Sequence, residues 1–485
     1  MSNFKSILKL EIKRSAVYTI SNFITLIGSF LVVPLFWQKL SPGDYGVIAI
    51  TEIIGVILGL FIGLQLDSSI TRFYYEWPET GRKKNVGAIW VAGWLSIITF
   101  GSTGIFILSF ASKFIFPDLD FYPYILLGLI NTMLASFLTI PLATFRIKQL
   151  SGLFFAFNIL SFVTQMGISI YFVLILNKGL YGYFIANTIS SALVAIGICF
   201  TMFRFATPCF RNGDLRRSLS FSLPLIPSGI VASISSLVDR IILQQYASLE
   251  VLGIYAISLK FTNLVIAFHT SLKLSYVPFM VEALGKDKLK GAADIGRMSL
   301  FYVFPILLLG MGIAAFVSDF VYMANKPEYF SVLNCIPWLI VPAILKTMNV
   351  YLTPGLFLAK KTNLSWIPTT IQLVMVVSGG LIFIPYYQLD GVIMSRYISE
   401  ISFFAISFIL TQRYYPLPIN WNKAILLLIL TCLGILVLTS IRHYNVFIGI
   451  LLKSILLIGF TGIGIVIIGG VANIKSFFKA YLSRD

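Results

Sequence analysis

The chain has 485 residues, of which 58% are hydrophobic and only 11% are charged. Soluble globular proteins carry about 25% charged residues, so this composition excludes a soluble globular protein. It predicts an all-α polytopic membrane protein. The net charge of +17 arises from 36 Lys and Arg against 19 Asp and Glu. An excess of this sign is typical of the cytoplasmic loops of membrane proteins and gives no reason to expect nucleic acid as a partner.

Fourteen apolar runs reach the length of about 20 residues that a membrane-spanning helix needs. The first run is too long for a signal-peptide core and is therefore predicted to be the first span. The second, eighth and tenth are long enough to be bent or to extend past the bilayer. In chain order, the predicted spans are 15–37, 46–70, 86–112, 121–145, 151–176, 180–203, 218–244, 252–283, 293–317, 328–358, 364–384, 389–412, 424–440 and 446–470.

Lys and Arg predict the orientation of these spans. Alternate loops and both tails are basic: 5–14, 82–84, 146–148, 204–217, 286–290, 360–361, 413–423 and 475–484. The opposite loops contain only Lys39, Lys113, Lys178, Lys326 and Arg442. Because basic loops stay in the cytoplasm, both termini are expected there.

Two stretches near the starts of the two halves resemble each other. When Gly46 is aligned with Gly253, Ser41 falls on Ser248, and an acid lies close by in each stretch. Either two polar loops are alike by chance, or one helix–turn–helix corner is used twice in a parallel repeat. The repeat predicts a six-helix bundle over 1–210, a second over 211–415, and two appended helices with a cytoplasmic tail over 416–485.

Several charges fall within or at the ends of predicted spans, where each costs at least about 2.5 kcal/mol at the bilayer centre. Their sign is mostly positive, which favours an anionic ligand. The candidate substrate-binding residues are Arg72, Arg240, Lys260, Lys273, Lys346 and Arg396. The candidate ion-coupling residues are Glu52, Asp239 and Glu400.

Structural roles remain as alternatives for some of these residues. Arg72 can snorkel to the membrane surface from a helix end. Arg396 and Glu400 are four residues apart, so they form either a structural ion pair or a coupling site. His269 is either a proton site or a hydrogen-bonded buried histidine. No metal site, disulfide or bound cofactor is expected from the scattered histidines and cysteines.

Prolines interrupt three of the predicted spans. Pro224 and Pro227 lie in the seventh, Pro34 in the first, and Pro337, Pro342 and Pro354 in the tenth. Proline removes a backbone hydrogen bond and bends a helix, and such bends are tolerated where protein or a cavity surrounds them. The first and seventh spans open the two halves, so their bends are either gating elements or static kinks.

Three short segments resemble motifs of a known family. Leu40–Gly46 resembles its first corner, Ile70–Tyr74 the end of its second helix, and Val238–Leu243 with Gly253–Ala256 and Lys260 the corner of its second half. The family is the polysaccharide-transport branch of the multidrug/oligosaccharidyl-lipid/polysaccharide (MOP) exporter superfamily, which includes the O-antigen (Wzx-like) flippases. The resemblance covers nearly the whole chain by topology and is weakest after about residue 330.

This resemblance implies a monomeric flippase of the bacterial cytoplasmic membrane, not an enzyme. Its substrate would be an undecaprenyl-pyrophosphate-linked oligosaccharide for O-antigen (lipopolysaccharide), capsule or exopolysaccharide synthesis, moved by alternating access through a cationic central cavity. Expected partners are a polysaccharide polymerase and a chain-length regulator, with coupling to protons or sodium ions left open. The alternatives are a lipid II flippase, a cation-coupled multidrug antiporter, and a membrane polysaccharide polymerase or ligase.

Overall fold

A computed structural model describes residues 24–469, except 26–27, 29–31, 118, 211–212, 287, 360, 362–363 and 442–445. The described residues form helices and connecting turns without a β-strand. They divide into two compact units, Met1–Ile241 and Ile242–Asp485. This architecture confirms the predicted all-α fold class.

The first unit contains a short helical turn at 32–36 followed by helices joined by tight turns. Its elements are α2 (Pro42–Gly63), α3 (Leu66–Phe73), α4 (Glu79–Ile115), η1 (Phe121–Ile125), α5 (Leu126–Ser136), α6 (Thr139–Ile147), α7 (Ser151–Ile170), η2 (Tyr171–Ile175), α8 (Gly179–Met202), α9 (Gly213–Ser222), η3 (Leu223–Leu225) and α10 (Ile226–Tyr246). Helix α10 crosses the boundary between the units.

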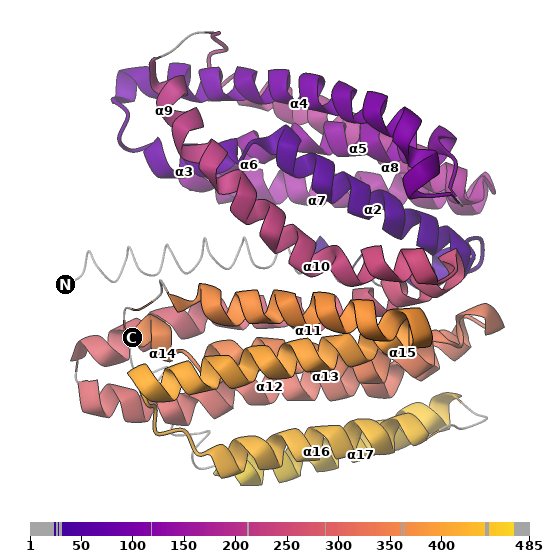
Figure 1. The fold of residues 1–485 in the computed structure, drawn as a ribbon, viewed down its shortest axis with the longest axis vertical. Helices are drawn as coiled ribbons and strands as arrows, with labels where there is room; N and C mark the ends of the chain where they lie inside the picture. Colours follow the sequence, from indigo (N-terminus) through magenta and orange to yellow (C-terminus); the bar gives the residue numbers. More distant parts are fainter. Residues whose placement is uncertain are drawn as a thin grey trace. The chain divides into compact units, whose positions relative to one another are not determined.

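In the second unit, helices α11, α12 and α13 pack side by side (Figure 1), and α15 packs on α13. Helices α16 and α17 pack on α12. The elements are α11 (Leu249–Lys286), α12 (Lys288–Met323), η4 (Pro327–Tyr329), α13 (Val332–Leu352), α14 (Gly355–Leu358), α15 (Trp366–Tyr414), α16 (Trp421–Ser440) and α17 (Val446–Ile468). The predicted appended pair, 424–440 and 446–470, corresponds to α16 and α17.

Twelve described segments are long and apolar enough to cross a membrane, so the chain is a multi-pass membrane protein. One of them, α15, has 49 residues and is broken at Gln388, where φ is 45° and ψ is −110°. This break separates the predicted spans 364–384 and 389–412. Most of the first predicted span, 15–37, lies outside the described residues, so the count of fourteen stays a prediction.

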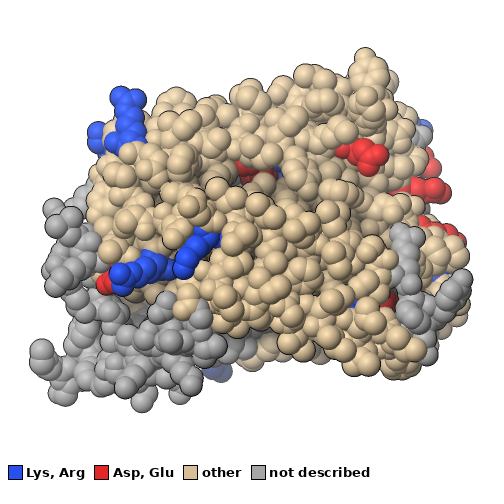
Figure 2. All heavy atoms as spheres, turned by 90° about the horizontal axis from the view of Figure 1, so that it is seen from below, with Lys and Arg blue, Asp and Glu red and all other residues tan. Residues whose placement is uncertain are grey.

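The surface agrees with a membrane location. On the described part of the face in Figure 2, most side chains are uncharged, and Lys, Arg, Asp and Glu gather towards two opposite ends. Charged side chains avoid the hydrocarbon region and are tolerated at its two surfaces. The charge distribution on this face is therefore the one expected of parallel membrane-spanning helices.

The second predicted span is bent, which is one of the two alternatives stated for it. Helix α2 ends at Gly63, and Leu64 and Gln65 have φ values of 46° and 52°, in the left-handed region. The chain then continues as α3. The interruption predicted at Pro224 is also found, because a single 3₁₀ turn separates α9 from α10.

The two similar corners have the same local structure. Ser41 caps α2: its Oγ accepts a hydrogen bond from the backbone N–H of Asp44 at 3.2 Å, while Asp44 Oδ2 accepts from the backbone N–H of Ser41 at 2.7 Å. Ser248 precedes α11, and its Oγ accepts from the backbone N–H of Val251 at 3.4 Å. A side-chain oxygen at this position satisfies one of the unpaired N–H groups that begin every helix.

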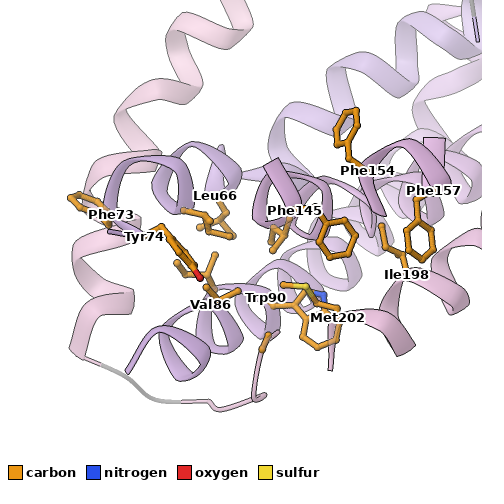
Figure 3. Close-up of a cluster of buried hydrophobic side chains, with 14 of the residues drawn as sticks. Leu66, Phe73, Tyr74, Val86, Trp90, Phe145, Phe154, Phe157, Ile198 and Met202 are labelled. Carbon is orange, nitrogen blue, oxygen red and sulfur yellow. The ribbon is translucent and has the colours of Figure 1, made fainter. Parts of the chain in front are cut away.

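A buried apolar cluster holds the short helices α3 and α6 of the first unit against α4, α7 and α8 (Figure 3). Trp90 is buried at its centre, with its ring centroid 4.5 Å from that of Trp94 and 5.2 Å from that of Phe203. Within a membrane such contacts stabilise by close packing, because lipid tails are as apolar as the side chains. The cluster fixes the end of α3, where Arg72 lies.

Gly87 is expected to be essential for the packing of α4. A Cβ atom at Gly87 would lie 1.8 Å from the carbonyl oxygen of Thr207, and this segment is also held by a hydrogen bond from the Thr207 N–H to the Lys83 carbonyl at 3.0 Å. Gly87→Ala is therefore expected to destabilise the protein by about 1–3 kcal/mol or more, measured as a lower melting temperature in detergent. Gly152→Ala is the control, since no atom lies within 4 Å of its added Cβ. Equal melting temperatures for the two variants would contradict the prediction.

Candidate functional site

The second unit brings three of the predicted basic residues to a common group of side chains. Lys273 lies on α11, Lys346 on α13 and Arg396 on α15, and these three helices pack on one another. Lys273 and Lys346 are exposed, and Arg396 is partly buried. The three are linked through two further residues, Glu400 and His269.

Glu400 is the buried acid of this group, with 2% of its surface exposed. Its Oε1 accepts a hydrogen bond from Gln372 Nε2 at 2.9 Å, and its Oε2 has no hydrogen-bond partner among the described residues. Lys346 and Arg396 are close enough for their positive charges to act on the carboxyl group. Glu400 is therefore a buried acid near two basic side chains, and one of its oxygens has no hydrogen bond among the described residues.

His269 lies near both Lys346 and Lys273. Both lysines are close enough to act electrostatically on the imidazole. The Tyr351 hydroxyl donates to the His269 carbonyl at 3.3 Å, and the two rings meet edge to face with centroids 5.4 Å apart. The buried Tyr276 hydroxyl donates to the Tyr351 carbonyl at 3.1 Å. This tyrosine network holds α11 and α13 in register and so positions the two lysines.

We name Lys273, Lys346, Arg396, His269 and Glu400 the basic cluster. It contains three basic side chains and one acid, so basic side chains predominate. Lysine and arginine side chains bind phosphate through charge-assisted hydrogen bonds. Lys260 lies on the same helix as His269, about two and a half turns before it. The cluster is thus suited to an anionic group.

In the first unit, Arg240 of α10 lies beside Glu52 of α2, with Nη1 3.9 Å from Oε2. The Glu52 side chain is 51% exposed and that of Arg240 is 17% exposed. Asp239 is fully buried, and its Oδ1 accepts a hydrogen bond from the Arg240 backbone N–H at 2.9 Å. A candidate coupling residue and a candidate substrate-binding residue therefore share one ion pair.

Arg72 lies outside the membrane-spanning segments, at the end of α3. It pairs with Glu76, which also accepts a hydrogen bond from Arg217 of α9 at 2.6 Å. Arg217 also lies over the Phe73 ring, 4.5 Å from its centroid. This arrangement joins α3 to α9.

Two predicted cytoplasmic loops, 82–84 and 146–148, converge at the same end of the first unit. Lys148 Nζ lies 4.7 Å from the centroid of the Phe205 ring. Burial of its side chain, followed by the positive charges of Lys83 and Arg82, lowers the pKa of Lys148. These two loops therefore lie on the same side of the first unit, and which side faces the cytoplasm stays a prediction.

Two features of the interior were missed from the sequence. Gln372 carries an amide group within a predicted span. Because polar residues in spans commonly form hydrogen bonds between helices, its position could have identified it as a candidate partner for a buried polar residue. Lys453 is 1% exposed, and its Nζ lies 2.7 Å from Asp319 Oδ2 and 2.7 Å from Ser318 Oγ. The sequence gives no signal for this ion pair, because its members are 134 residues apart.

Comparison with solved structures shows the fold that this arrangement belongs to. The chain is similar to the lipid II flippase MurJ in an inward closed conformation, with a TM-score of 0.69, 15% identity, and coverage of 93% of this chain and 99% of that chain. It is also similar to a MATE transporter in complex with MaL6, with a TM-score of 0.54, 16% identity, and coverage of 83% and 95%. A third similar structure is an inward-facing multidrug resistance MATE transporter of the MOP superfamily, with a TM-score of 0.52, 14% identity, and coverage of 82% and 94%.

Sequence comparison identifies the family. No curated protein matches the chain significantly. The sequence model of the family described as "Polysaccharide biosynthesis protein" matches residues 12–283, which is more than half of the chain. The resemblance deduced from the three motifs is thereby confirmed, and the chain belongs to the polysaccharide biosynthesis protein family.

Proposed function

We propose that this protein is a flippase for undecaprenyl-pyrophosphate-linked oligosaccharide repeat units of O-antigen, capsule or exopolysaccharide. The observation that carries the proposal is the basic cluster, which lies on apolar helices of a member of this family. A pyrophosphate needs several cationic donors, whereas its polyprenyl tail can remain in lipid. A transporter, rather than an enzyme, requires only such reversible binding.

The proposed mechanism is alternating access through a cationic central cavity. The six-helix bundles over 1–210 and 211–415 would rock, so that the cavity opens first to the cytoplasm and then to the outside. Lys260, Lys273, Lys346 and Arg396 would bind the pyrophosphate, with Arg240 contributing from α10. Arg72 would act before them, as an attractive charge at the cytoplasmic surface.

Glu400, Glu52 and Asp239 are the proposed sites for a coupling proton or sodium ion. Glu400 has the strongest support, because its carboxylate is buried, lies among cations and keeps one oxygen without a hydrogen bond among the described residues. The protein would act as a monomer in the bacterial cytoplasmic membrane, with both termini inside. It would supply a polysaccharide polymerase and a chain-length regulator on the outer face.

A lipid II flippase is the second candidate, favoured by the similarity of fold to MurJ over nearly the whole chain. Its substrate also joins a polyprenyl pyrophosphate to a sugar, so the basic cluster suits both. A multidrug antiporter is disfavoured by the predominance of basic side chains in the cluster, since cationic drugs would be repelled. The two flippase functions differ in which lipid-linked intermediate accumulates when the protein is lost.

Deletion of the gene in its host tests the proposal. Lipid-linked intermediates would be identified by mass spectrometry, and their leaflet assigned by reaction with a membrane-impermeant reagent. We expect complete oligosaccharide repeat units to accumulate on the inner leaflet. Accumulation of lipid II instead would establish the second candidate. Normal turnover of both, with altered sensitivity to cationic drugs, would overturn the flippase function.

A further inference from the structure

The second unit contains a pocket that the transport function does not use. It has a volume of about 840 Å³ and is lined by α12, α13, α16 and the part of α15 that follows Gln388. Pockets of about 300–1,000 Å³ are the size that holds drug-sized molecules or part of a lipid. We call it the α12–α16 pocket.

The lining of the pocket is polar near the ends of its helices and apolar farther along them. Asn334 lies two residues after the start of α13, Asp390 two residues after the break in α15, and Ser440 at the end of α16. Ala314 and Val341 lie nine residues from the corresponding ends of α12 and α13, which is about 13 Å along a helix. The pocket therefore changes from polar at the membrane surface to apolar within the bilayer, as a phospholipid does.

The charge of the lining selects the ligand. Asp390 is the one acidic residue in the described lining, which contains no Lys or Arg. The neighbouring Asp319 is already paired with Lys453, whose Nζ also bonds to the lining residue Ser318. Trp338, 51% exposed, and Tyr397 add aromatic surfaces, which attract cations as well as apolar groups. A positively charged headgroup is favoured.

The hydroxyl oxygens of Thr439 and Ser440 in the pocket lining can accept hydrogen bonds from a ligand. Thr439 Oγ1 donates to the Ile435 carbonyl at 2.7 Å, and Ser440 Oγ donates to the Val437 carbonyl at 2.8 Å. With their hydrogens directed at the backbone, both oxygens offer lone pairs to a ligand, as the Asp390 carboxylate does. A primary ammonium group has three N–H donors to match them, whereas a trimethylammonium group has none. The Asn334 amide has N–H donors for an adjacent phosphate.

We propose that the α12–α16 pocket binds a phospholipid with a primary ammonium group in its headgroup. The ammonium lies between Asp390, Thr439 and Ser440, and an acyl chain extends along the apolar lining. A bound lipid of this kind would fill the space beside α16, one of the two helices appended to the second bundle. This site is independent of the proposed flippase activity and does not involve the basic cluster.

Lipid binding to the purified full-length protein tests this assignment. The delipidated protein would be titrated in detergent, with native mass spectrometry as the readout, against three lipids of identical acyl chains. Their headgroups would be phosphoethanolamine, phosphocholine and phosphoglycerol. We expect the first to bind about tenfold more tightly than the others, the size of one charge-assisted hydrogen bond. Equal binding of the three lipids would overturn the proposal, and this comparison needs no variant.

Substitutions then locate the site. Asp390→Asn is expected to remove the preference for phosphoethanolamine. Glu328→Gln is the matched control, because Glu328 is an exposed acid in the same unit that does not line the pocket, and it should keep the preference. An unchanged preference in Asp390→Asn would overturn the assignment. A long-chain primary alkylamine serves as a further probe. If it bound and Asp390→Asn abolished that binding, while the phosphoethanolamine lipid bound no more tightly than the other lipids, the pocket would be an amine site and the phospholipid assignment would be overturned.

Discussion

A Lys260→Ala/Lys346→Ala variant is expected to fail to complement a flippase-null strain while being produced at a normal level. Both residues lie in membrane-spanning helices, and Lys346 is an exposed member of the basic cluster. A hydrogen bond to a charged group contributes about 1.5–3 kcal/mol, so loss of two should weaken pyrophosphate binding by more than about a hundredfold. The measurement is restoration of surface polysaccharide. Full complementation by the double variant would contradict the assignment.

Two controls separate loss of binding from loss of structure. Lys39→Ala/Lys326→Ala removes the same charge from two predicted outward loops and should complement fully. Removing Lys346 also removes a positive charge that acts on the buried Glu400 carboxyl group. If instability caused the failure, Lys346→Ala would melt at a lower temperature than the unchanged protein, and Lys346→Ala/Glu400→Gln would recover that temperature. We expect the Lys260→Ala/Lys346→Ala protein to keep its melting temperature while failing to transport.

Loss of either member of the Asp319–Lys453 ion pair is expected to lower the stability of the protein by about 3–5 kcal/mol. Both side chains are buried, and each substitution alone leaves the other charge buried without its partner. Replacing both, as Asp319→Leu/Lys453→Met, removes the two charges together and should recover most of the loss. Melting temperatures of the four proteins in one detergent, compared as a double-mutant cycle, measure the coupling.

The exposed pair Arg82–Glu79 is the control for this cycle. Arg82 Nη1 lies 3.2 Å from Glu79 Oε1, but the Glu79 side chain is 87% exposed. Surface ion pairs contribute about 0–1 kcal/mol, so Glu79→Gln should change the melting temperature little. If Asp319→Leu/Lys453→Met lost as much stability as the two single variants added together, the two side chains would not be coupled, which would contradict the prediction.

Local patterns in the sequence determined the elements of the fold. Apolar runs of bilayer length predicted the helices, because each span must satisfy its backbone hydrogen bonds within itself. The alignment of Ser41 with Ser248 predicted two similar helix starts, because capping depends on residues three positions apart. Lys346, Arg396 and Glu400 could be named as candidates because a charge in an apolar run is conspicuous wherever it folds.

Only the tertiary structure decided which of these side chains meet. The four-residue spacing left open whether Glu400 pairs with Arg396 or serves as a coupling site, and in the structure its hydrogen-bond donor is Gln372, on the other side of the break in α15. Lys453 forms an ion pair with Asp319, and Arg240 forms one with Glu52. Asp390 lines a pocket formed by four helices. Such contacts depend on the rotation of each helix about its axis and on its depth in the membrane. Packing between helices sets both quantities, whereas the hydrophobicity along a single helix does not determine them.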